Sequence, residues 1–502
     1  MSRRPAYHAG ESARQIRNDA REPTDWVLVT LAVLAVLSRL VWAVWVHPPR
    51  EHVFSDMAHY VHRARLVASW EVAPGDRMMA WQAWGTHALL AIPMILLGPT
   101  GEAALELAGL MWAGCSAATV VLAYRLAVRV LPRKREHGPH WPAAAVGIAT
   151  LLWFPLLSHT GYFVSETPYA CCLLATTHAI VVLIQSGRGA LRAGLWGAIA
   201  FALRPQVAVF FGLLALAWGI DRKRQRWSQR VDVRAVLRFA IPLAIVLAIS
   251  LIRTRVYTGE LGGVAENGTM NLTAARCHNI VTRSFPDPAS LASAQATGVP
   301  PPERRVSLPG FRALAREGAD HPLALRPALG GESIDFVGYI GDREIHRAIR
   351  KRCYAATGVA GQLRYSVTNL ALAWVVARPW PESSDHGAPQ WLPVAVRARK
   401  LAAWLAPLGL FGMILALWRL ATTAGGPDAG RTAGLGICAL QLLSFLLTAA
   451  VFFGAPRLRT PYDPYVLILI VALALARSRF DGVKPVRRAR ESGLSSRSTS
   501  PA

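Results

Sequence analysis

Long apolar runs alternate with short polar segments along the 502 residues of this chain. Several of these runs reach the roughly 20 residues that a helix needs to cross the hydrocarbon core of a bilayer. The expected spans are Trp26–Val46, Leu105–Val130, Pro142–Ser158, Pro168–Gln185, two half-spans within Ala193–Gly219, Val236–Ile252, Leu401–Leu420, Thr432–Gly454 and Tyr465–Ala476. The pattern therefore predicts an all-α polytopic membrane protein with about ten transmembrane helices.

Two polar regions between the spans are too long to be simple turns. The first, residues 47–104, contains Trp84–Leu97, a short apolar stretch interrupted by Pro93. Such a stretch is typical of a re-entrant or interfacial element. The second, residues 253–400, precedes the last three helices and includes the amphipathic stretch Ser366–Ala377, which suggests a helix lying at the interface. We expect both regions on the extracytoplasmic face, as a catalytic first loop and a long outer loop.

The two ends of the chain, residues 1–25 and 477–502, are polar and rich in arginine or serine. We expect both to be disordered cytoplasmic tails. Between them lie an N-terminal transmembrane module at 26–252, the outer loop region, and the C-terminal transmembrane helices at 401–476.

The composition agrees with a lipid environment, because 53% of the residues are hydrophobic and only 17% are charged, against about 25% charged residues in soluble domains. Much of the formal net charge of +25 lies in short segments beside the apolar runs. These segments are Arg14–Arg21, Arg133–Arg135, Arg222–Arg234 and Lys484–Arg490. They are typical of cytoplasmic loops and attract anionic lipid headgroups. Membrane lipids are therefore the expected partners, and nucleic acid is not, because no zinc-finger or RNA-binding motif is present.

Two acidic residues lie on the expected outer face. Asp56 follows the first helix, and a partly desolvated carboxylate there could act as a general base. An Asp before Met-Ala-His-Tyr also suits a helix N-cap, and this is the alternative interpretation. Glu166 lies at the tip of the helical hairpin, where it would complement the dipole of the helix that Pro168 begins. Two carboxylates on one face are what a two-acid site requires.

Arginines interrupt the apolar pattern at two places. Arg204-Pro205 lies inside the run 193–219, where a helix break would open a cavity for an anion; a snorkelling arginine in a single tilted helix is the alternative. Arg457 and Arg459 lie in the turn before the last helix, and positive charge on the outer side opposes the usual bias. Paired guanidinium groups there favour a phosphate site over a solvated turn.

The outer loop holds a polar cluster and two cysteines. Asn267, Asn271 and His278 have the side-chain types that suit hydroxyl-rich ligands, although a plain turn has the same composition. Cys277 and Cys353 could form a disulfide if this segment faces an oxidising compartment, and two unpaired thiols are the alternative.

The motifs occur in a fixed order along the chain. They are Asp56, Tyr60 and Ala64 in the first outer loop, Glu166 at the hairpin tip, Gly194 to Pro205, Asn267 to Leu272, and Arg457 to Pro461 before the last helix. In this order they resemble the C-type membrane glycosyltransferases (the GT-C superfamily), in particular the branch of protein O-mannosyltransferases and lipid A aminoarabinose transferases. The resemblance extends over about residues 26–476.

The resemblance implies a hexosyl- or pentosyltransferase that moves a sugar from a polyprenyl-phosphate donor to a lipid, glycan or protein acceptor. The reaction would take place on the periplasmic side of a bacterial inner membrane. Asp56 would accept the proton of the acceptor hydroxyl or orient the acceptor. Arg204, Arg457 and Arg459 would neutralise the departing phosphate, and Glu166 would position the acceptor or a divalent metal ion. The expected substrate contacts are Tyr60, Asn267, Asn271, His278 and Tyr462.

One residue departs from the family pattern, and two other classes of function compete with the transferase. Asp56 is followed by Met57, where protein mannosyltransferases usually carry Asp-Glu, which argues against protein O-mannosylation. A transporter or flippase is the main alternative, because Arg204 in a broken helix is also a transporter feature. A non-catalytic membrane scaffold is the third hypothesis.

Overall fold

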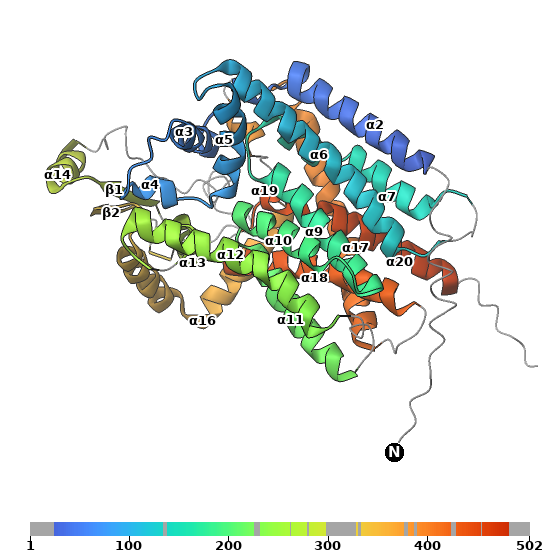
Figure 1. Cartoon of the computed structure of the whole chain (residues 1–502). Coiled ribbons are helices and arrows are strands. Elements are labelled where there is room, and N and C mark those ends of the chain that lie inside the picture. The colour runs from blue at the N-terminus through green and yellow to red at the C-terminus, as the bar shows by residue number, and fades with distance from the viewer. Residues whose placement is uncertain are drawn as a thin grey trace, which may run out of the picture.

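The computed structural model describes residues 25–133, 138–224, 231–261, 263–278, 281–297, 328–329, 333–375, 380–385, 389–422, 428–452 and 454–480. In these residues the chain is almost entirely helical, with one small parallel sheet (Figure 1). The expected disordered tails lie outside the described residues, except for Asp25 and the end of the last helix, which runs to Phe480.

Seven described segments are long and apolar enough to cross a membrane. They are Trp26–Glu51, which begins with α2 (Trp26–Val41), α6 (Glu102–Val130), α9 (Glu166–Ser186), α12 (Val233–Thr258), α17 (Leu392–Thr422), α18 (Ala429–Val451), and Pro456–Ala476, which joins α19 (Pro456–Arg459) to α20 (Asp463–Phe480). A bent pair, α7 (Trp141–Leu151) and α8 (Phe154–Ser158), would make an eighth. The protein is thus a multi-pass integral membrane protein.

Each of the ten expected spans has a helix in the structure, but fewer than ten meet the length and composition of a full span. Apart from the bent pair α7–α8, the difference arises at Ala193–Gly219, where the chain forms α10 (Ala190–Leu203) and α11 (Val207–Arg224). α10 is a shorter apolar helix, and α11 ends in charged residues. Whether these two half-length helices cross the bilayer therefore stays a prediction.

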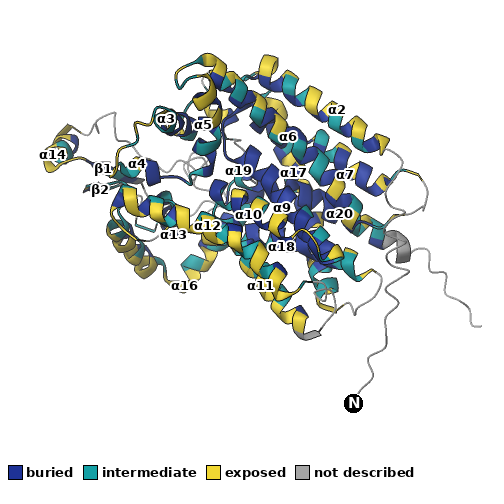
Figure 2. Cartoon of the chain, viewed as in Figure 1, coloured by how far each residue is buried: buried dark blue, intermediate teal, exposed yellow. Residues whose placement is uncertain are grey.

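The outer helices carry apolar stripes on the surface. On α12 the stripe follows helical spacing, and its members are 44–63% exposed: Leu237, Ile241, Ile245, Ile249 and Ile252. A continuous apolar face of this kind would be unstable in water, and it is the face that lipid covers. By contrast, α9, α18 and α20 lie in the middle of the bundle and are largely buried (Figure 2).

The helix break at Arg204 follows from the residue after it. Proline at 205 disfavours helical backbone in the preceding residue, and Arg204 is extended, with φ −148° and ψ 103°. α11 then folds back, so that Phe211 contacts the position of Gly197. A single tilted helix across this run is therefore excluded.

Close packing holds α10 in place on its other side. A Cβ added at Gly194 would lie 2.3 Å from the backbone oxygen of Phe239 on α12. Only glycine lets the two helix backbones approach this closely. The close packing of α10 on α12 therefore fixes the helix that ends at Arg204.

The two polar regions, residues 47–104 and 253–400, contain more helix than their composition suggested. Their elements are α3 (Asp56–Ala68), α4 (Arg77–Ala80), α5 (Gly85–Leu97), α13 (Asn267–Cys277), α14 (Pro288–Thr297), α16 (Arg343–Val375), β1 (Val281–Phe285) and β2 (Ser333–Val337). The expected interfacial helix Ser366–Ala377 lies, as far as Val375, in the second part of α16, which bends at Gly358, and its last two residues lie outside the described residues. Cys277 and Cys353 are joined by a disulfide that connects α13 to α16.

Candidate functional site

Two acids and two arginines from four distant segments form one ion-pair network. An Nη2 hydrogen of Arg457 is donated to Asp56 Oδ2 across 3.0 Å. The Nε of the same guanidinium lies 3.3 Å from Glu166 Oε1. That oxygen also accepts a hydrogen bond of 2.6 Å from Arg204 Nη2. The network therefore joins the beginnings of α3, α9 and α19 to the break after α10, all in one part of the bundle (Figure 1).

Asp56 is oriented by its contacts rather than by a capping role. It is the first residue of α3, and no side-chain cap is formed at that helix end. Its Oδ1 accepts a 3.3 Å hydrogen bond from Gln82 Nε2. Arg63 Nη2 donates to the Oε1 of the same amide, so the NH₂ group of Gln82 faces the carboxylate. The N-cap interpretation of Asp56 is therefore wrong.

Arg253 holds Gln82 where it meets Asp56. Arg253, near the end of α12, donates to the backbone oxygens of Met79, Gln82 and Val264, each across 3.0 Å. Three carbonyl contacts to one guanidinium fix the loop between α4 and α5. No sequence pattern points to Gln82 or Arg253, because both act through contacts between distant segments.

Arg457 is enclosed by one aromatic ring and two carboxylates. Its guanidinium lies 3.9 Å from the centroid of the Trp380 ring, which is a cation–π contact. The Arg457 side chain is 20% exposed and that of Asp56 is 34% exposed, whereas Glu166 is only 2% exposed. A bound molecule can thus reach Asp56 and Arg457, and Glu166 can act only through the arginines.

Arg204 is held by polar groups of α9. Its Nε donates to Ser165 Oγ across 2.9 Å, and its guanidinium lies over the Tyr169 ring at 5.9 Å. The Tyr169 hydroxyl in turn shares a 2.8 Å hydrogen bond with the Tyr462 hydroxyl. Tyr462 is fully buried, so it supports this wall instead of presenting a hydroxyl to substrate. The snorkelling interpretation of Arg204 does not fit these contacts.

Tyr60 lies beside the network on α3. Its ring is buried, and burial, followed by the nearby Asp56 carboxylate, raises the pKa of its hydroxyl. The Arg63 guanidinium lies 5.5 Å from the ring centroid. Tyr60 therefore stays a neutral wall residue at physiological pH.

Arg459 is separate from Arg457 although only one residue lies between them. It is fully buried, and its Nε donates to Asp463 Oδ1 across 2.8 Å. Its Nη1 donates to the Ala373 carbonyl, and its guanidinium lies 4.8 Å from the Trp374 ring centroid. A guanidinium neutralised in this way does not face the Asp56 network, so the geometry gives Arg459 a structural role and not the expected phosphate contact.

Three expected substrate residues, Asn267, Asn271 and His278, lie on α13 or directly after it. The backbone N–H of Asn267 donates to the Trp81 carbonyl, which is adjacent to Gln82. Asn271 is half-buried on the same helix. His278 stacks on Tyr365 with centroids 4.0 Å apart. The partners of Asp56 and Arg457 in the network are Gln82, Glu166 and Trp380. The substrate role of Asn267, Asn271 and His278 stays a prediction.

A second buried network lies beside the first. Arg399 Nη2 donates to both carboxylate oxygens of Glu382, at 3.0 and 3.1 Å, and Ser158 Oγ donates to Glu382 Oε1 across 2.8 Å. The same Nη2 lies 3.3 Å from His159 Nε2. Burial by itself would raise the pKa of Glu382, but the Arg399 guanidinium and the surrounding donors lower it on balance. This network fixes the segment that carries Trp380.

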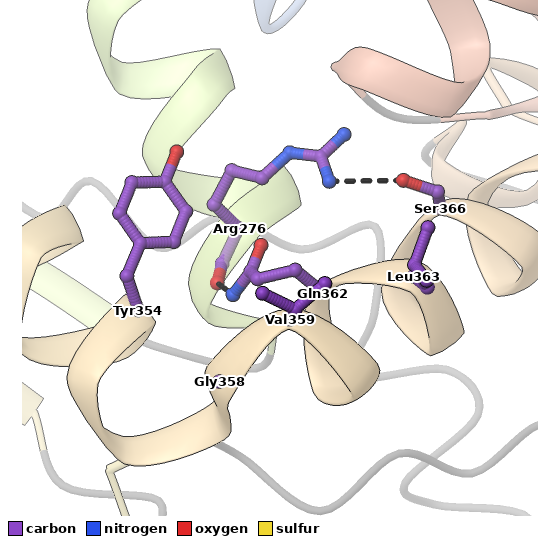
Figure 3. Close-up of a pocket in the computed structure, with 7 residues that line it drawn as sticks. All are labelled: Arg276, Tyr354, Gly358, Val359, Gln362, Leu363 and Ser366. Carbon is purple, nitrogen blue, oxygen red and sulfur yellow. Dashed lines mark hydrogen bonds between the residues drawn. The ribbon is translucent and has the colours of Figure 1, made fainter.

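The cavity shown in Figure 3 is elsewhere, between α13 and the bend of α16. It has a volume of about 390 Å³ and is lined by Arg276, Tyr354, Gly358, Val359, Gln362, Leu363 and Ser366. The Arg276 guanidinium is occupied by Ser366 and by the carbonyls of Ala450 and Val451. None of the lining residues belongs to the Asp56 network, and we assign the cavity no chemistry.

Comparisons with known proteins find loose similarity to solved membrane-protein structures. No family model and no curated protein matches it. The chain is similar in structure to ArnT from Cupriavidus metallidurans in the apo state, with 14% identity over 90% of this chain and 78% of that one and a TM-score of 0.34. The same protein bound to undecaprenyl phosphate gives 13% identity, 91% and 79% coverage, and a TM-score of 0.35.

A third similar structure is the arabinosyltransferase EmbB from Mycobacterium smegmatis. It has 16% identity over 93% of this chain but only 43% of that chain, with a TM-score of 0.32. Superpositions this loose do not carry a function from one protein to another. The reading of the site therefore depends on the residues of this chain.

Proposed function

We propose that this protein is an integral membrane glycosyltransferase that moves a sugar from a polyprenyl-phosphate carrier to an acceptor hydroxyl. The observation that carries the proposal is the pairing of Asp56 with Arg457, both accessible, beside the buried Glu166 and the half-buried Arg204. A base for the attacking hydroxyl and a cation for the departing phosphate lie side by side. These are the two groups that glycosyl transfer from a phosphate requires.

The reaction assigns one role to each accessible group. Asp56 Oδ2 accepts the proton of the acceptor hydroxyl while the acceptor oxygen attacks the anomeric carbon. The bond from that carbon to the phosphate oxygen breaks, and the lipid phosphate leaves with the electron pair. Arg457 stabilises the negative charge that develops on this oxygen, and Arg204 adds a second positive charge behind it.

Donor binding would also prepare the base. In the structure the Oδ2 lone pair of Asp56 is occupied by Arg457. A phosphate that binds Arg457 competes with Asp56 for the guanidinium, because bidentate guanidinium–phosphate pairing is strong. The carboxylate oxygen is then released for the acceptor hydroxyl.

Glu166 acts in this scheme as a positioning residue. Its Oε1 faces both Arg204 and Arg457, so it aligns two guanidinium groups that would otherwise repel each other. Two cations at one carboxylate oxygen also disfavour a divalent ion there. The expectation that Glu166 holds a metal ion is therefore set aside.

The side of the membrane follows from the charge pattern. Glu166 begins α9, and the other end of that helix leads into the basic turn at 188–192. At a rise of about 1.5 Å per residue, a helix of 21 residues separates its ends by roughly the thickness of the hydrocarbon core. Because basic loops face the cytoplasm, we place the Asp56 network on the non-cytoplasmic face of a bacterial inner membrane.

The proposal is tested with the purified full-length protein in detergent or nanodiscs. Synthetic undecaprenyl-phosphate-linked hexoses and pentoses serve as donors, and released undecaprenyl phosphate is measured with and without a lipid or glycan acceptor extract. We expect release that depends on the protein and on one class of sugar. Movement of intact lipid-linked sugar across liposomes without bond cleavage would instead support the flippase hypothesis.

A further inference from the structure

Three metal-ligating side chains meet at a place that the transferase site does not use. His47 lies at the end of the first membrane segment, His52 lies in the turn that leads to α3, and Asp385 lies in the short segment before α17. One nitrogen or oxygen atom of each residue lies within 4.8 Å of the corresponding atoms of the other two. More than three hundred positions separate the histidines from the aspartate, so only the fold brings them together.

The two separations from Asp385 are compatible with ligands of one metal ion. His52 Nδ1 lies 2.9 Å from Asp385 Oδ2, and His47 Nε2 lies 3.5 Å from the same oxygen. Two ligand atoms that each lie about 2.0–2.1 Å from a tetrahedral zinc ion are about 3.3 Å apart. Both observed separations lie close to this value.

One ligand atom in the cluster lacks a hydrogen-bond partner. His47 is 2% exposed, and within the described part of the chain its Nε2 accepts or donates no hydrogen bond. A buried ring nitrogen without a partner costs roughly 1–3 kcal/mol. The two imidazole rings are stacked with centroids 3.5 Å apart, and two protonated rings at that distance would repel each other. A bound cation satisfies the nitrogen and removes the need for protons on the rings.

The surroundings hold each ligand in position. The Tyr162 hydroxyl donates to Asp385 Oδ2 across 3.0 Å, as an outer residue commonly does for a ligating carboxylate. The His47 ring packs edge-on against the rings of Tyr162 and Trp391. At Gly161 an added Cβ would lie 2.4 Å from His47 Cδ2, so only glycine leaves room for the imidazole. These contacts hold the His47 ring and the Asp385 carboxylate close together.

We propose that His47, His52 and Asp385 bind a divalent transition-metal ion, with Zn²⁺ as the best match. Two imidazoles and one carboxylate form a ligand set of borderline softness that suits zinc and disfavours Mg²⁺ or Ca²⁺, which take oxygen ligands. The ion fastens the first outer loop to the segment 380–385. The first of these segments continues to Asp56, and the second carries Trp380, which stacks on Arg457.

The experiment measures metal directly and needs no transferase assay, so its outcome is independent of the proposed function. The full-length protein is purified with a tag that contains no histidine, treated with a chelator, and dialysed against Zn²⁺. Zinc per chain is then determined by mass spectrometry of the metal, and Co²⁺ is substituted to record its visible absorption. We expect one ion per chain in the wild type and the absorption bands of a low-coordinate Co²⁺ site.

Single variants distinguish the proposed metal ligands from residues that only lie near them. His52→Gln and Asp385→Asn should each weaken zinc binding by more than about 100-fold, and Tyr162→Phe by about 10- to 100-fold, as is usual for an outer partner. His62→Gln, which changes an exposed histidine on α3, should retain the ion. Size-exclusion profiles confirm that each variant is folded. The proposal is overturned if the wild type retains no stoichiometric zinc, if His52→Gln and Asp385→Asn bind zinc as the wild type does, or if His62→Gln loses it equally.

Discussion

The carboxylate of Asp56 accepts a hydrogen bond from Arg457 although 401 positions separate the two residues. The first lies at the start of α3 and the second in the turn before α20. This contact places both residues on one side of the bundle, which the transferase hypothesis requires. Had they been on opposite sides of the membrane, no shared reaction centre could exist.

Replacing Asp56 should remove proton transfer and leave donor binding largely intact. We expect Asp56→Asn to lower turnover on the order of 100-fold or more, because general-base catalysis commonly contributes that much. The measurement is the rate of undecaprenyl phosphate release at saturating donor. Asp428→Asn changes an exposed aspartate in a turn far along the chain and is the matched control. Wild-type turnover in Asp56→Asn would remove the catalytic assignment.

Replacing Arg457 should act on the donor instead. Arg457→Gln removes the cation that bridges Asp56 and Glu166, and a lost charge-assisted contact to phosphate corresponds to roughly a 10- to 100-fold change. We expect the KM for the lipid donor to rise by about that factor, with a further fall in turnover. Arg431→Gln alters a half-exposed arginine and should leave both constants unchanged. An unaltered KM in Arg457→Gln would contradict the phosphate assignment.

Arg459 should affect stability more than donor binding. Arg459→Met leaves Asp463 buried without its partner, which costs on the order of 3–5 kcal/mol. The double variant Arg459→Met with Asp463→Leu should recover much of this loss, because no charge remains buried. Thermal unfolding in detergent tests the prediction. A rise in donor KM without a fall in Tm would return Arg459 to the donor site.

The disulfide between Cys277 and Cys353 should stabilise the region that contains α13 and α16. It closes a loop of 76 positions, and removing such a crosslink typically costs about 2–4 kcal/mol. We expect Cys353→Ser to lower the Tm, and Cys438→Ser, a change at a free buried cysteine, to lower it less. Mass spectrometry of non-reduced peptides checks the bond itself, and free thiols at both positions in the folded protein would contradict it.

Acid should destabilise the protein through Glu382. Because its pKa is lowered in the folded state, its contribution to stability is complete above the ordinary carboxyl pKa and is lost as the pH falls through the lowered value. We expect the Tm to fall as the pH drops below the ordinary carboxyl range. Glu382→Gln should start from a lower Tm at neutral pH, since Arg399 loses its partner, and should show a flatter acid profile. Identical slopes for both proteins would contradict the assignment.

Part of the candidate site could be recognised in the sequence. Asp56, Glu166, Arg204 and Arg457 each stand out because charge beside a membrane span is costly and needs a partner. Residue type alone groups Arg459 with Arg457. Its partner Asp463 lies one helical turn later, and this spacing was the available signal for a local ion pair.

The sequence by itself determined where the helices lie and where one of them breaks, because apolar length and proline geometry are local properties. The basic segments beside the spans also predict which end of each span faces the cytoplasm. The tertiary structure alone decided which charges share a site: Gln82 and Trp380 join Asp56 and Arg457, and Asp385 meets His47 and His52. Contacts across hundreds of residues depend on how the helices pack, and no local pattern records that packing.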